Sequence, residues 1–105
     1  MSNSELNAAL NEVESGLNEL ENLLADGAFS RNQITSMLKN NTSSARENGK
    51  NVLFSAIKQV GTHCENLENL KNMFPNETRI ASLLRRYAFC GQQLLENYNM
   101  VESWG

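Results

Sequence analysis

Residues 6 to 24 repeat apolar side chains at alternating steps of four and three residues. The series consists of Leu6, Leu10, Val13, Leu17, Leu20 and Leu24. This is the a/d spacing of a heptad pattern, which places every member on one face of an α-helix. The a positions are Leu10, Leu17 and Leu24, and the d positions are Leu6, Val13 and Leu20. The g positions, Ala9, Gly16 and Leu23, are also small or apolar and widen that face. Such a face is typical of a bundle helix that packs against two neighbours.

The charges beside this apolar face disfavour a symmetric coiled coil. A parallel homodimer gains ion pairs when its e and g positions carry opposite charges. Here the e positions are Glu14 and Glu21, and residues 1–30 contain six acidic residues and no basic one. Residues 31–105 contain nine bases and six acids. The two parts of the chain can therefore attract each other, within one molecule or between two.

The spacing of apolar residues predicts an all-α fold, a small bundle of four helices at about 3–25, 31–39, 51–73 and 77–101. No stretch alternates polar and apolar residues with period two, so no strand is expected. Capping boxes begin the first helix at Ser2 and the second at Ser30. Gly27 is a candidate C′ residue of the first helix, and Asn76, after Pro75, can cap the fourth.

Residues 39–51 are open to two interpretations because almost none of them can be buried. In the first, they form a loop, since Asn, Thr, Ser and Gly are together poor helix formers. In the second, helices 2 and 3 are fused into one long helix whose middle is solvated. The composition favours the break.

Length and composition indicate one helical domain over residues 1–105. The chain has 40% hydrophobic and 20% charged residues, which is ordinary for a globular protein. Residues 102–105 are expected to form a flexible tail unless Trp104 docks.

No apolar run is long enough to span a membrane, and no apolar segment of a signal peptide follows Met1. Two cysteines are too few for a disulfide scaffold. A cytoplasmic protein without membrane contact is expected.

The residues that most often carry catalysis or bind metals are few. His63 and Cys64 are adjacent, so on a helix they point about 100° apart and cannot act as a nucleophile–base pair. Together with Cys90 they lack the spacing of a zinc site. We therefore expect no catalytic residue, no metal, no cofactor and no enzymatic activity, with both cysteines serving as small core residues.

Four acidic residues repeat every seven positions along the first helix, on the face away from Leu10 and Leu17. This acidic row consists of Glu5, Glu12, Glu19 and Asp26. The simplest interpretation is a solvated helix face. The alternative is a recognition surface with negative charges about 10 Å apart, suited to a basic protein groove.

The basic residues do not predict nucleic-acid binding. Arg79, Arg85 and Arg86 form a group beside Tyr87, but the sequence pI is about 5.1. A phosphate-bearing ligand at Arg85 and Arg86 is a further hypothesis, which no Gly-rich loop supports.

These observations favour a non-catalytic protein–protein interaction module over an enzyme. We expect a homo-oligomer, a homodimer with the heptad residues of the first helix at or near the interface, that also binds an unidentified partner protein. The alternative is a small inhibitor, of the anti-defence or immunity type, that uses the acidic row against a basic target. A small-ligand-binding helical protein is the third hypothesis.

Overall fold

The computed structural model describes residues 2–40 and 43–104, and within them it contains helices and no strand. The helices are α1 (Asn3–Ala25), α2 (Arg31–Lys39), α3 (Ser43–Met73) and α4 (Thr78–Ser103). The predicted all-α fold with four helices is confirmed, and the bounds of α1 and α2 agree with those expected from the sequence.

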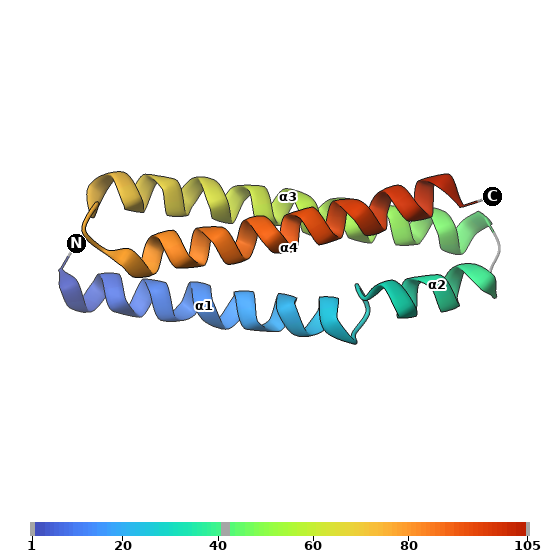
Figure 1. The fold of residues 1–105 in the computed structure, drawn as a ribbon, viewed down its shortest axis with the longest axis horizontal. Coiled ribbons are helices and arrows are strands. Elements are labelled where there is room, and N and C mark those ends of the chain that lie inside the picture. Colours follow the sequence, from blue (N-terminus) through green and yellow to red (C-terminus); the bar gives the residue numbers. More distant parts are fainter. Residues whose placement is uncertain (1, 41–42, 105) are drawn as a thin grey trace.

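The helices lie side by side in an elongated molecule of 51 × 20 × 17 Å. Figure 1 shows that α2 continues the direction of α1, so the two form one row, while α3 runs back along it and α4 returns. α4 packs against all three other helices, whereas α1 and α3 barely approach each other. α4 is therefore the central helix of the bundle.

The core is built from one apolar stripe of each helix, as the sequence spacing predicts. Its most deeply buried large side chains are Leu10, Leu17, Leu53, Leu67, Ile80, Leu83, Leu94 and Val101. Burying each of them contributes about 1.5–3 kcal/mol relative to leaving it in water. The buried Asn97 side chain of α4 donates a hydrogen bond to the carbonyl oxygen of Phe29, 2.8 Å away. This bond ties α4 to the connection between α1 and α2.

Serine side chains cap α1 and α2 at the predicted residues. The Ser2 hydroxyl accepts from the Glu5 amide at 3.2 Å, and the Ser30 hydroxyl accepts from the Gln33 amide at 3.3 Å. In a capping box the amide of the N-cap residue also donates to the side chain three residues further on. The Ser30 amide donates instead to the carbonyl oxygen of Gly27. The tight turn before α2 therefore supplies a partner that Gln33 would otherwise provide.

Gly27 occupies the position after the C-cap Asp26, but it does not adopt the left-handed conformation expected of a C′ glycine. A different constraint applies. A Cβ atom on Gly27 would lie 2.9 Å from the Cα atom of Leu23, closer than atoms can pack. Glycine is required here because the chain folds back over the last turn of α1.

α3 begins at Ser43, about eight residues earlier than expected, so most of residues 39–51 is helical rather than loop. Residues 41 and 42 lie outside the described residues. Tertiary contacts offset the poor helix propensity of this segment. The Arg46 guanidinium donates to the carbonyl oxygen of Glu102 at the end of α4, and the Met37 side chain of α2 lies directly against Gly49.

Both ends of α4 differ from the expectation. Glu77, not Asn76, is its N-cap, and the Glu77 carboxylate accepts from the amide of Arg79 at 3.2 Å. At the other end the helix continues to Ser103, and Trp104 is half-buried against the core. The docking of Trp104 extends the helix into the segment expected to be a flexible tail.

Gly61 and Gly91 both lie inside helices but differ in the space around them, so replacing each by alanine distinguishes helix propensity from packing. A methyl group at Gly61 would meet nothing within 4 Å, whereas one at Gly91 would lie 3.2 Å from a methyl of Val60. We expect Gly61→Ala to raise the free energy of unfolding by about 0.5–1 kcal/mol because alanine lowers the entropy cost of the helix. Gly91→Ala should gain nothing because it crowds the α3–α4 contact. Urea unfolding measures both, and equal gains would contradict this account.

Candidate functional site

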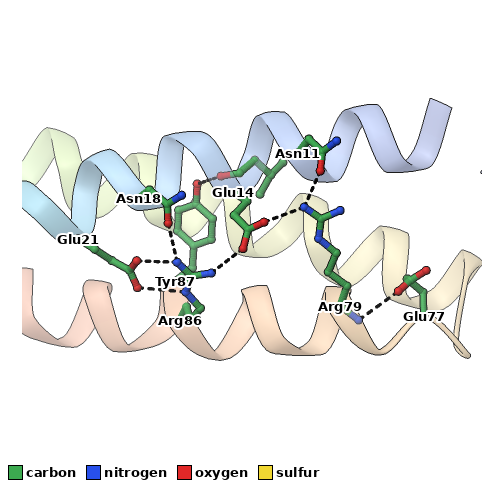
Figure 2. A network of polar contacts seen from close by, with 9 residues as sticks. Asn11, Glu14, Asn18, Glu21, Glu77, Arg79, Arg86 and Tyr87 are labelled. Atoms are coloured by element: carbon green, nitrogen blue, oxygen red, sulfur yellow. Dashed lines mark hydrogen bonds and ion pairs between the residues drawn. The ribbon is translucent and has the colours of Figure 1, made fainter. Parts of the chain in front are cut away.

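α1 and α4 are joined by a polar contact whose two sides have the same seven-residue spacing. Arg79 of α4 donates from one terminal nitrogen to Asn11 at 2.7 Å and to Glu14 at 2.8 Å. One heptad further along, the Arg86 guanidinium reaches Glu14 at 2.9 Å and Glu21 at 2.6 Å (Figure 2). Because the two helices run side by side, arginines seven residues apart meet the e positions of α1 in register.

Arg86 makes the most complete set of contacts in this network. Besides its contacts to Glu14 and Glu21 at the terminal nitrogens, it donates to Asn18 at 2.8 Å, and its Nε donates to Glu21 at 3.1 Å. Of the two arginines considered for a phosphate-bearing ligand, Arg86 is thus bound to α1, whereas Arg85 is exposed and makes no hydrogen bond or ion pair among the described residues.

The electrostatics of the network keep its groups in the forms that the hydrogen bonds need. The hydrogen bonds from Arg79 and then Arg86 hold the pKa of the Glu14 carboxyl below its usual value. Burial raises the pKa of the Tyr87 hydroxyl, which stays protonated and donates to the carbonyl oxygen of Val13 at 3.1 Å. Tyr87 thus fixes α4 against the middle of α1.

A groove with a volume of about 890 Å³ lies between α1 and α3, on the side of α1 that α4 does not cover. Its α1 wall consists of d and g positions, namely Ala9, Val13, Gly16, Leu20 and Leu23. Val52, Ala56 and Val60 of α3 form the opposite wall, and Tyr87 of α4 lies at its base. The lining spans residues 9 to 23 of α1, a length of about 20 Å along the helix.

The two rims of the groove differ in charge. The α1 rim carries Glu12 and Glu19, and the α3 rim carries neutral polar side chains such as Ser55 and Gln59. His63 of α3 also lines the groove, and its ring stacks on that of Tyr87 with 5.1 Å between centroids. The groove is thus an apolar trough with one acidic edge.

The heptad residues proposed as an interface divide into two groups. Leu6, Leu10 and Leu17 are buried in the core of their own chain. Val13, Leu20 and Leu24 are only partly buried, and the first two line the groove. The free part of the apolar face therefore lies at Val13, Leu20 and the g positions rather than along the whole seam.

All four residues of the acidic row are exposed. No ion pair joins any of them to another residue within the described ranges 2–40 and 43–104. Glu12 and Glu19 lie at the groove, whereas Asp26 is the C-cap of α1. The row therefore contrasts with Glu14 and Glu21, whose charges are paired by α4.

The two cysteines lie at shielded positions. Cys90 is buried and Cys64 is half-buried, and burial raises the pKa of both thiols. In the part of the chain that the structure describes, no three His, Cys, Asp or Glu side chains gather as a metal ion would require. The His63 ring stacks on that of Tyr87.

The α3 side of the groove was not identified from the sequence. Val52, Ala56 and Val60 have the spacing of an ordinary core-facing helix stripe. The polar residues at its edge, such as Ser55 and Gln59, do not differ from those of a solvated helix face. The α1–α4 network did leave a signal. Arg79 and Arg86 have the same seven-residue spacing as Glu14 and Glu21, and matching these two pairs would have placed α4 beside α1.

Comparison of the chain with protein-family models, with curated proteins and with solved structures finds no match. None of the helices among the described residues is both long and apolar enough to cross a membrane.

The α1–α4 network predicts a loss of stability in acid. Because the folded pKa of Glu14 lies below its ordinary value of 4.5, the ionised carboxylate stabilises the fold above that pH. This contribution is lost as the pH falls through the lowered folded pKa. We expect Glu14→Gln to be less stable at neutral pH and to lose less stability than the wild type between about pH 5 and about pH 3. Urea unfolding of both proteins across this pH range measures their free energies of unfolding.

Glu12→Gln is the matched control because it removes the same charge from α1 without breaking an ion pair. It should keep the wild-type dependence of stability on pH. If both variants flatten that dependence equally, general charge repulsion and not the Arg79–Glu14–Arg86 network is responsible.

The thiols should be unreactive in the folded protein. We expect a thiol-specific chromogenic reagent to leave Cys90 unmodified and to modify Cys64 slowly, because both are shielded and hard to ionise. Both should react at once in denaturant. Fast native modification of Cys90 would contradict its buried position.

Proposed function

We propose that this protein is a non-catalytic protein–protein interaction module that accepts a helix in the groove between α1 and α3. The observation that carries the proposal is the unpaired half of the α1 apolar face. α4 packs on the side of Leu10 and Leu17, whereas Val13, Leu20 and the g positions line the groove. Val52 and Leu23, 53% and 37% exposed, extend the apolar surface at its edge.

The dimensions and lining suit a helix. The α1 wall is about 20 Å long, which matches an amphipathic helix of about 14 residues. Apolar positions of such a helix, three and four residues apart, would pack into the trough as in other helix-in-groove complexes. A bundle of three rows would become one of four, and the buried apolar area would stabilise the complex.

The expected homodimer is one way to fill this groove. A dimer could not use the complete seam proposed from the sequence, since Leu6, Leu10 and Leu17 already pack inside their own chain. It would have to pair the groove of one molecule with that of another. Light scattering after size exclusion measures whether the protein is a monomer or a dimer.

A groove-filling substitution tests the proposal. Gly16 faces the groove, and a Cβ there would lie in ordinary contact with the Tyr87 hydroxyl, so a larger side chain projects into the trough and not the core. We expect helical peptides selected from a display library on the wild type to bind Gly16→Phe at least about tenfold more weakly. Fluorescence anisotropy measures the affinities, and circular dichroism checks the fold.

Ser15→Phe is the control, because Ser15 is exposed and does not line the groove. It adds the same side chain one residue away and should leave binding unchanged. Binders that ignore Gly16→Phe would contradict a function in the groove.

The inhibitor hypothesis is the second candidate, supported by the exposed and unpaired acidic row. It predicts that Gly16→Phe leaves binding intact and that charge reversal in the acidic row abolishes it. Binding to a basic protein target that survives Gly16→Phe but is lost in the double variant Glu12→Lys, Glu19→Lys would assign the function to the acidic row without the groove.

A further inference from the structure

The charges at the edges of the groove bear on which kind of helix it accepts. The inference drawn from them rests on the proposed function. α1 has two acidic heptad rows, one on each side of its apolar face. The row at Glu14 and Glu21 is met by arginines of α4 at 2.6–3.1 Å. The acidic row at Glu12 and Glu19 has the same spacing, borders the groove and meets no base among the described residues.

We infer that the groove takes an amphipathic helix of a different protein that carries Arg or Lys at seven-residue intervals along one edge. Such a helix would meet Glu12 and Glu19 as Arg79 and Arg86 of α4 meet Glu14 and Glu21. Its opposite edge is polar and uncharged, because the α3 rim presents groups such as Ser55 and Gln59. Its apolar face packs on the d and g positions of α1.

A second copy of this chain does not have the required pattern. Its pairs of basic residues seven positions apart are Lys39 with Arg46 and Arg79 with Arg86. The first pair lies on two different helices, and the second is already bound to α1. A second α1 would place its own acidic row near Glu12 and Glu19, and like charges would repel. Charge complementarity therefore favours a heterologous partner.

Three synthetic peptides of about three heptads each test the inference. They share one apolar face and differ only along one edge, which carries Arg, Gln or Glu once in every heptad. Isothermal titration or anisotropy at low and high salt measures their affinities for the full chain. We expect the Arg peptide to bind about tenfold or more tightly than the Glu peptide, with the Gln peptide between them. High salt should reduce the difference.

Two double variants locate the effect. Glu12→Lys, Glu19→Lys should reverse the order of the peptides, and the milder Glu12→Gln, Glu19→Gln should abolish the preference. Glu68→Lys, Glu96→Lys makes the same change in net charge at exposed residues that do not line the groove. It should retain the preference for Arg.

The outcomes separate this inference from the proposed function. If all three peptides bind the wild type equally and Gly16→Phe weakens them, the groove binds helices but the acidic row does not choose among them, and the inference is overturned. A dimer by light scattering that Gly16→Phe dissolves would place a second copy in the groove and overturn it too. If no peptide binds and the chain stays monomeric, both proposals fail.

Discussion

The structure depends on an apolar face of α1 that is wider than one neighbouring helix can cover. α4 packs on the a positions and buries Leu10 and Leu17 completely. α3 packs on α4 and leaves Val13, Leu20 and the g positions at the groove. Among the described residues, the contact between α3 and α4 is the most extensive between any two helices. The groove is the consequence.

Polar contacts determine the register of α1 against α4, while apolar contacts supply most of the stability. A leucine stripe alone permits shifts by one heptad at little cost. Arg79 and Arg86 disfavour such shifts, because a shift by one heptad would leave one of them without its acceptors on α1, and the Tyr87 hydroxyl would lose its bond to the carbonyl oxygen of Val13. The same register determines the shape of the groove, because Tyr87 of α4 lines it. An exposed ion pair contributes little energy, yet a matched pair of them specifies one alignment.

Helix positions followed from local rules wherever the local and tertiary preferences agreed. The caps at Ser2 and Ser30 and the apolar stripes are of this kind. The predictions were wrong where distant contacts outweighed propensity. Residues 43–51 are helical although they are rich in poor helix formers, because Arg46 and Gly49 contact α4 and α2. Gly27 is required by a close approach to Leu23 and not by a left-handed turn. The contacts of Arg46 and Gly49 join segments that no short window of sequence brings together, whereas the Gly27–Leu23 approach is local and depends on how the chain turns after α1.

The sequence by itself determined that this chain forms amphipathic helices, that α1 has an apolar face for two neighbours, and that two acidic rows flank that face. These properties depend only on the helical period, so they can be read from residue spacing. The tertiary structure alone decided which side of α1 is covered, which acidic row is paired and which is left at a groove. That choice depends on the competition of α1 and α4 for α3, which is a matter of packing between elements far apart in the chain.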